Sequence, residues 1–248
     1  MEVAECVRSA PKRADRALEL VDTGEAKTIE EVCKMLGITP DCTVKAVVYA
    51  VKGDADKVII AFVRGDLEVN EAKLKKTVRL NVAPYEGGVS DSVVCGNIGP
   101  KDLSDKVIAV YDKSLIDCVD MVVGANKEGY HYRGFNVARD LQGATFSDIA
   151  KVKDGDVCPV CGGKLRLENG IEIGNIFQLG TKYSAAMGMS VHAEDGTSFA
   201  PIMGCYGIGV GRAIASVAEE SGDDKGLVLP VTIAPWQLHL CALRTDKA

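Results

Sequence analysis

Glycine occupies every second position from residue 207 to residue 211, and no other pattern constrains the fold of the second half of the chain as much. A mostly apolar run over residues 199–206 precedes these glycines, and residues 210–220 follow with the apolar periodicity of a helix. The absent side chains leave backbone on which a flat ligand can lie. Arg212 stands in the first turn of the helix, where a guanidinium can stack on an adenine ring or face phosphate. The pattern predicts a strand, a turn and a helix, and taken alone it fits an ordinary glycine-rich turn as well as a nucleotide site.

Apolar runs rich in β-branched residues predict most of the strands. Two such runs, 44–51 and 58–63, flank the polar segment 52–57 and predict a β-hairpin. Further strands of the first half are predicted at residues 107–111, 121–123 and 130–135. In the second half they are predicted at residues 171–177, 189–193, 199–206 and 238–243, with a hairpin turn at Asp195-Gly196.

Few helices are predicted, and their ends are marked by capping residues. Thr28 and Glu31 have the spacing of a capping box, and Gly37 is placed to end the helix that they begin. Asn70 can cap a short helix that runs through Lys76. Strands with few helices and no regular alternation of the two predict an α+β fold with a mixed sheet.

Composition excludes several classes of protein. The chain has 248 residues, of which 47% are apolar and 26% charged, which is typical of a soluble globular protein with one or two domains. No run of 18 apolar residues and no signal-peptide core occur, so we expect no membrane partner and a cytoplasmic location. Nine scattered cysteines, an odd number, favour reduced thiols. With a net charge of −6, an RNA partner needs a local basic face, and the candidate cluster at residues 73–79 is also compatible with a solvated helix face.

Two blocks of the second half, residues 174–184 and 203–212, resemble the last part of the catalytic core of bacterial-type prolyl-tRNA synthetase. Gly-x-Gly-x-x-Arg in the second block matches motif 3 of the class II synthetases. The first half resembles the editing domain inserted into these enzymes, which is related to free-standing deacylases of mischarged tRNA. This second resemblance is carried by residues 20–23, 26–29, 43–45, 63–66, 70–71, 96–100, 124–126 and 131–132.

The resemblance implies the domain organisation. It implies an editing domain with a mixed, mainly antiparallel sheet, followed by part of the antiparallel-sheet core of a class II synthetase. We expect residues 1–16 to be a remaining segment of that core, 17–145 the editing domain, 146–236 the core with motif 3, and 237–248 the start of the anticodon-binding domain. Motifs 1 and 2 of class II enzymes are not found, so we expect the chain to correspond to the middle of the family protein.

In the family, a Gly-x-x-x-Pro loop and a lysine on the strand after the first helix are the main catalytic features. Here they fall on the loop Gly96 to Pro100, which includes Gly99, and on Lys45. Hydrolysis of an aminoacyl ester develops negative charge on the carbonyl oxygen, which backbone N–H groups of a glycine-containing loop can stabilise. The lysine can contact phosphate or ribose at the 3′ end of a tRNA. Taken singly, the loop also fits an ordinary turn and the lysine a surface residue.

The resemblance also places His131 near the amino-acid pocket, with Asp112 as a weaker candidate for the same pocket or for polar support. His131 alone is equally compatible with a structural role. No Ser-His-Asp or Cys-His arrangement is evident, so we expect an activated water rather than a covalent intermediate. Alanine is smaller than proline, and a pocket rejects a smaller apolar side chain by only about 1–3 kcal/mol, so a second, hydrolytic site is needed.

The resemblance implies a proline and ATP site in the second half. The candidate ligands are Asn175, Gln178, Thr181, Cys205, Gly207, Gly209 and Arg212. Gln178, Thr181 and Cys205 are also compatible with packed strand residues. Asn175 stands where many relatives carry histidine, which puts its direct contact with substrate in doubt. ATP and Mg are the expected cofactors of the full-length enzyme. Cys158 and Cys161 have the form of half a zinc ribbon, but the sequence holds no second Cys-x-x-Cys. We therefore expect two reduced thiols and no metal site. Cys158 and Cys161 are the residues that would bind zinc if such a site existed.

These features predict a portion of a prolyl-tRNA synthetase. The full enzyme would join proline to its tRNA with ATP as a homodimer, and its inserted domain would hydrolyse mischarged alanyl-tRNA. We expect this chain by itself to edit and not to aminoacylate. Two alternatives are a non-catalytic module that binds tRNA or a partner, and a free-standing aminoacyl-tRNA deacylase. We also expect the residues after about 151 to be less stable than the first domain.

Overall fold

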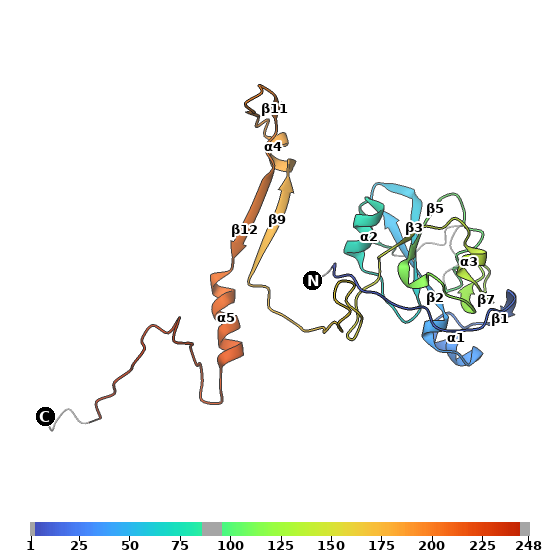
Figure 1. Cartoon of the computed structure of the whole chain (residues 1–248), viewed down its shortest axis with the longest axis horizontal. Coiled ribbons are helices and arrows are strands. Elements are labelled where there is room, and N and C mark those ends of the chain that lie inside the picture. Colours follow the sequence, from blue (N-terminus) through green and yellow to red (C-terminus); the bar gives the residue numbers. More distant parts are fainter. Residues whose placement is uncertain (1–2, 86–95, 244–248) are drawn as a thin grey trace. The chain divides into compact units, whose positions relative to one another are not determined.

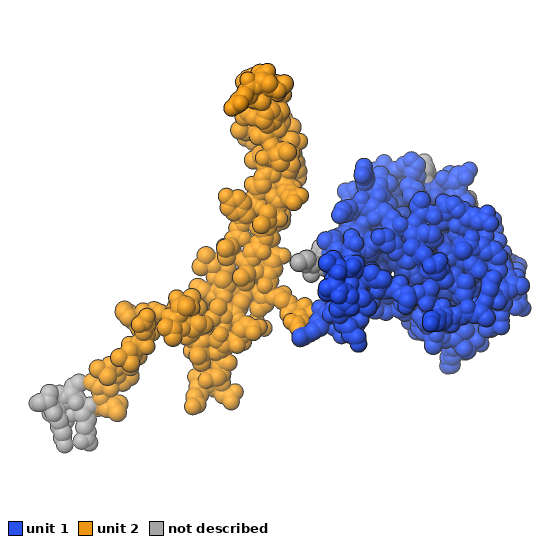
Figure 2. Space-filling model, viewed as in Figure 1, with its two compact units in different colours: residues 1–167 blue, residues 168–248 orange. Residues whose placement is uncertain are grey.

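The computed structural model describes residues 3–85 and 96–243 and divides the chain into two compact units, residues 1–167 and 168–248 (Figures 1 and 2). Helices and strands both occur, and most strand pairs are antiparallel, so the predicted α+β class is confirmed. The finer division into four segments stays a prediction. Among the described residues, no helix is both long enough and apolar enough to cross a bilayer.

The larger sheet of the first unit has five strands (Figure 1). Its order is β4-β2-β3-β5-β8, with bounds β4 Val82–Pro84, β2 Val44–Val51, β3 Asp54–Arg64, β5 Val107–Asp112 and β8 Phe146–Ser147. Strands β2 and β3 pair antiparallel with Val44 opposite Arg64, which confirms the predicted hairpin. Strand β5 joins β3 in parallel, and β8 joins β5 in parallel. The sheet is therefore mixed, as the sequence predicts.

A second, antiparallel sheet has the order β1-β7-β6. Its strands are β1 Glu19–Asp22, β7 Tyr130–Phe135 and β6 Met121–Gly124. The strands β6 and β7 lie where the sequence predicts them, whereas β1 was not predicted. Glu19 pairs with Arg133 and Asp22 with Tyr130, so the beginning of the unit lies beside a strand from near its end.

The helices of the first unit begin and end at the predicted capping residues. Helix α1, Ile29–Leu36, has the complete capping box of Thr28 and Glu31, and Gly37 ends it with a φ of 63°. Helix α2, Glu71–Val78, begins at Asn70, whose side chain accepts hydrogen bonds from two backbone amides. A third helix, α3, spans Val137–Asp140, and short 3₁₀ turns cover η1 Pro40–Cys42 and η2 Lys113–Leu115.

Strand β3 is buried on both faces and separates two apolar clusters. Ile60 and Phe62 face a cluster that includes Met121 and Phe135 of the second sheet. The alternate residues of the strand face the other cluster, which includes Leu74 of α2. Because both faces are covered, residues 58–63 of β3 are a continuous apolar run instead of an alternating one.

The second unit consists of short strands and helices whose side chains are mostly exposed. Its strands are β9 Gly174–Gly180, β10 Val191–His192, β11 Ser198–Phe199 and β12 Met203–Ile208, and its helices are α4 Lys182–Ala186 and α5 Val210–Ser221. Strand β9 pairs antiparallel with β12, and β10 with β11. The predicted helix after the glycines and the turn at Asp195-Gly196 are both confirmed.

Some strand predictions for this unit are wrong. Residues 199–206 are not one strand, because Pro201, which lacks an N–H, lies in the break between β11 and β12. The strand predicted at 171–177 begins three residues later, at Gly174, and only two residues of 189–193 are in a strand. Residues 238–243 form no strand. Many apolar side chains of this unit are exposed, among them Ile176 at 79% and Tyr206 at 82%.

Candidate active site

A pocket of about 380 Å³ opens in the first unit between the start of α1, strand β2 and the loop that begins at Gly96. Three of the residues predicted from the sequence, Lys45, Gly96 and His131, line it. Gly99 and Pro100 lie in the same loop but not in the lining, and Asp112 is also outside it. The pocket thus brings together residues that lie far apart in the chain.

The loop from Gly96 to Pro100 requires glycine at two points. Gly96 has a φ of 88°, and a Cβ there would lie 2.8 Å from the side chain of Lys27. A Cβ on Gly99 would lie 1.7 Å from the carbonyl oxygen of Gly124, so the loop touches the end of β6 backbone to backbone. The Gly99 amide donates to Oδ1 of Asn126 at 2.8 Å, and it is therefore not free to bind a substrate.

His131 is a buried, neutral imidazole. Its Nδ1 lies 2.7 Å from Oγ1 of Thr23, and the Thr23 hydroxyl lies 3.1 Å from the carbonyl oxygen of Gly129. A hydroxyl has one proton, so both contacts are hydrogen bonds only when Nδ1 carries the histidine proton. This tautomer leaves Nε2 as an acceptor. Burial lowers the pKa of His131 below its ordinary value, which keeps the ring neutral near pH 7. Thr23 was not predicted as a site residue.

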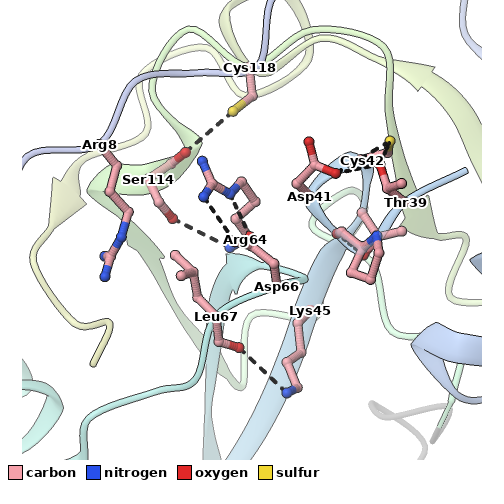
Figure 3. A network of polar contacts seen from close by, with 12 residues as sticks. Arg8, Thr39, Asp41, Cys42, Lys45, Arg64, Asp66, Leu67, Ser114 and Cys118 are labelled. Atoms are coloured by element: carbon pink, nitrogen blue, oxygen red, sulfur yellow. Dashed lines mark hydrogen bonds and ion pairs between the residues drawn. The ribbon is translucent and has the colours of Figure 1, made fainter. Parts of the chain in front are cut away.

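Lys45 reaches across the pocket wall to a turn after β3. Its Nζ lies 3.5 Å from the carbonyl oxygen of Leu67 (Figure 3). That turn is fixed by a two-point ion pair between Arg64 and Asp66, with distances of 2.5 and 3.0 Å. Burial opposes the charge on Asp66, but the hydrogen bonds and charges of Arg64 and Lys153 together outweigh it and bring the pKa of Asp66 below its ordinary value. The long contact from Lys45 leaves its ammonium able to bind an anion.

Asp112 has a supporting position. It is 1% exposed, and its Oδ1 accepts from the Ser114 amide at 2.8 Å. Its Oδ2 accepts from the amides of Ile149 and Ala150 at 2.8 and 2.9 Å. These bonds tie β5 to the segment that follows β8. Of the two roles considered for this residue, pocket lining and polar support, the geometry favours support.

The candidate ligands of the second unit lie on the β9–β12 ribbon. Asn175 is opposite Gly207 and Cys205 is opposite Phe177, so Asn175 and Cys205 share one face. Gln178 is an odd number of residues from Asn175 and faces the other side. Thr181 precedes α4, and Gly209 precedes α5.

Glu172 joins two of these candidates. The guanidinium of Arg212 donates to its carbonyl oxygen at 2.7 Å and lies 3.6 Å from its carboxylate. The side-chain amide of Asn175 donates to the same carboxylate at 2.9 Å. The sequence offered no signal for Glu172. Its carboxylate therefore contacts the side chains of both Arg212 and Asn175.

The Cys158–Cys161 segment is a tight turn between residues that pair at Val157 and Lys164. The backbone amides of Cys161 and Val160 hydrogen-bond the Cys158 sulfur and lower the pKa of its thiol. Gly162 permits the turn with a φ of 71°. Across residues 3–85 and 96–243, no group of three or more His, Cys, Asp or Glu side chains is placed to hold a metal ion.

Residues 23–141 match the family model of the aminoacyl-tRNA editing domain. The segment that contains the pocket is therefore similar to the aminoacyl-tRNA editing domains. A solved structure described as hypothetical protein APE2540 is similar to 54% of this chain and 92% of its own, with a TM-score of 0.48 and 18% identity.

Proline–tRNA ligases are similar to nearly the whole of this chain. The chain is 40% identical over 236 residues to that of Geobacillus sp. (strain WCH70), covering 94% of this chain and 41% of the relative. It is 38% identical over 243 residues to that of Dehalococcoides mccartyi (strain CBDB1), covering 97% of this chain and 42% of the relative. The predicted resemblance to bacterial-type prolyl-tRNA synthetase is confirmed. The chain spans less than half the length of these relatives.

Proposed function

We propose that the first unit hydrolyses alanine from alanyl-tRNA for proline, as the editing domain of a prolyl-tRNA synthetase. The observation that carries this proposal is the pocket that collects Lys45, the Gly96 loop and His131. In the proposed reaction, the Lys45 ammonium binds phosphate or ribose at the 3′ end of the tRNA and holds the ester near the loop. Backbone amides of the loop stabilise the oxyanion that forms when water attacks the carbonyl carbon.

His131 sets the amino-acid end of the pocket in this proposal. As a neutral ring with Nε2 as an acceptor, it can hydrogen-bond the α-ammonium group of alanine or the attacking water without adding charge. Its ring is fixed by Thr23, so the pocket wall at this point is rigid. A rigid wall suits a site that must admit alanine and exclude the larger proline ring.

We further propose that the second unit contributes to a proline and ATP site in a longer, cytoplasmic and homodimeric protein with Mg as the metal cofactor. Arg212 is the proposed nucleotide ligand, after release of Glu172. Asn175 and Cys205 on one face and Gln178 on the other divide the remaining candidate contacts between two surfaces. The isolated chain should not form prolyl-adenylate, and a measurable ATP–pyrophosphate exchange rate would contradict this expectation.

The test of the editing function measures hydrolysis of alanyl-tRNA and prolyl-tRNA, both on the proline tRNA. We expect the chain to remove alanine and to spare proline. Lys45→Ala should abolish turnover, whereas Lys52→Ala, at an exposed lysine outside the pocket lining, should not. If the chain binds the tRNA but hydrolyses neither ester, and Lys45→Ala weakens only binding, the chain is a binding module.

A further inference from the structure

Asn126 uses its whole side-chain amide on the loop that begins at Gly96. It has a φ of 52°, a left-handed conformation that asparagine tolerates better than most residues. Its Oδ1 accepts from the Gly99 amide at 2.8 Å. Its Nδ2 donates to the carbonyl oxygens of Gly99 and Lys101 at 3.1 and 2.5 Å. The backbone amide of Asn126 donates to the Asn97 carbonyl oxygen at 2.8 Å.

Asn97 is a second residue that hydrogen-bonds the loop to the segment around Gly129. This residue is 1% exposed, and its Oδ1 accepts from the Gly129 amide at 3.2 Å. Its Nδ2 lies 3.4 Å from the carbonyl oxygen of Tyr130. The loop is therefore held at residues 97 and 99, the two neighbours of Ile98, by the segment that connects β6 to β7.

This clamp fixes the direction of the Ile98 amide. The Asn97 carbonyl oxygen accepts from the Asn126 amide at 2.8 Å, so this carbonyl points toward the segment that connects β6 to β7. The peptide bonds are trans, and in a planar trans peptide the N–H points opposite to the preceding carbonyl. The Ile98 N–H therefore points away from Asn126, which does not line the pocket. Ile98 lines the pocket, and no group in the described part of the chain accepts a hydrogen bond from its amide.

We propose that Asn126 is a positioning residue for the hydrolytic step, and that it aims the Ile98 amide at the oxyanion of the scissile ester. This inference rests on the proposed editing function. The Gly99 amide is occupied by Asn126 and cannot take that role. The two neighbouring amides of the loop therefore differ in role: the Gly99 amide anchors the loop to Asn126, and the Ile98 amide stays available for the substrate. Preorganised donors of this kind act on the transition state more than on the bound ester.

The test compares Asn126→Gly with Asp102→Gly. Both residues are left-handed, with φ values of 52°, so glycine relieves the same backbone strain at each, but only Asn126 holds the loop. We expect kcat for alanyl-tRNA hydrolysis to fall about 100-fold in Asn126→Gly while KM stays within about twofold. Asp102→Gly should match the wild type. Asn126→Asp keeps an oxygen that can accept from Gly99 and should fall between them.

Amide hydrogen exchange supplies a second readout. Residues 96–101 should exchange faster in Asn126→Gly, while β2 and β3 keep their protection. An active wild type with an equally active Asn126→Gly variant would overturn the inference and leave the proposed function intact. A variant whose kcat and KM both change while β2 and β3 lose protection would show a merely structural role. A wild type that hydrolyses neither ester would overturn the proposed function and this role with it.

Discussion

Replacing Asp112 by asparagine separates a structural role from a catalytic one. The buried carboxylate accepts three backbone hydrogen bonds, from Ser114, Ile149 and Ala150. Asparagine has nearly the same shape, but one of its two terminal atoms becomes an NH₂ group that cannot accept. In the less costly orientation the NH₂ group faces Ser114, and one buried N–H loses its partner.

The cost follows from these three contacts. A buried N–H left unpaired costs about 1–3 kcal/mol, and each of the two remaining bonds loses about 1 kcal/mol with the charge of its acceptor. We therefore expect the free energy of unfolding to fall by about 3–5 kcal/mol. For a chain of about 150–250 residues, this corresponds to a fall in Tm of about 10 °C.

The assay is thermal unfolding followed by circular dichroism, with Asp102→Asn as the control because Asp102 is exposed. The control should stay within about 0.5 kcal/mol of the wild type. Alanyl-tRNA hydrolysis is then measured at a temperature at which every variant is folded, and Asp112→Asn should keep a rate within about threefold of the wild type. An unchanged Tm together with lost hydrolysis would refute the reasoning and make Asp112 catalytic.

Three further predictions concern other positions. Gly99→Ala places a Cβ against a backbone oxygen, whereas the Cβ of Gly143→Ala enters open space and costs only the left-handed backbone strain of about 1–2 kcal/mol. The urea midpoint of unfolding should therefore be lower for Gly99→Ala than for Gly143→Ala. Equal midpoints would contradict the steric argument. Burial lowers the pKa of His131, so as the pH falls below about 6.5 the unfolded chain binds the proton more readily and stability decreases. His131→Asn should flatten the change in Tm between pH 7.5 and 5.5, and an identical slope would count against this. The Cys158 thiol, its pKa lowered by backbone amides, should react with iodoacetamide at pH 7 faster than Cys118, whose pKa burial raises to about 11; mass spectrometry of the labelled peptides decides.

The sequence predicts best the features whose cause lies within a few residues. The helix that begins at Thr28 and ends at Gly37 was predicted from its caps, and so was the start of α2 at Asn70. A capping hydrogen bond joins residues two or three positions apart, so the pattern contains the whole interaction. The hairpin of β2 and β3 was predicted for the same reason, since its turn is local.

Predictions fail where an element depends on a distant partner. Strand β1 is short and has no residue in the apolar core, and its pairing with β7 could not be seen in its own four residues. The run at 238–243 is apolar enough for a strand, but no described neighbour pairs with it. An apolar run is buried only when another surface packs against it. Tyr206 lies in an apolar run and is 82% exposed, because no described surface packs against it.

The candidate site shows the same division. Lys45, the Gly96 loop and His131 could be named from a family resemblance, because their order along the chain matches. The hydrogen bonds of Asn126 to a loop more than 20 residues away follow no periodicity, so its part in the site was missed. Glu172 was missed for the same reason, since its contact with Arg212 spans 40 positions.

The first and last segments of the first unit pair with each other, and this pairing affects how the unit can be inserted into another protein. The Val7 amide donates to the Val157 carbonyl oxygen at 2.9 Å, and β1 lies beside β7. The two points at which the chain enters and leaves this unit are therefore about one strand spacing apart, roughly 5 Å. A surface loop of a host protein can hold the whole unit without a change in the distance between the two ends of the loop. Closing such a loop costs little entropy. Adjacent ends of this kind keep the strain on a receiving framework small.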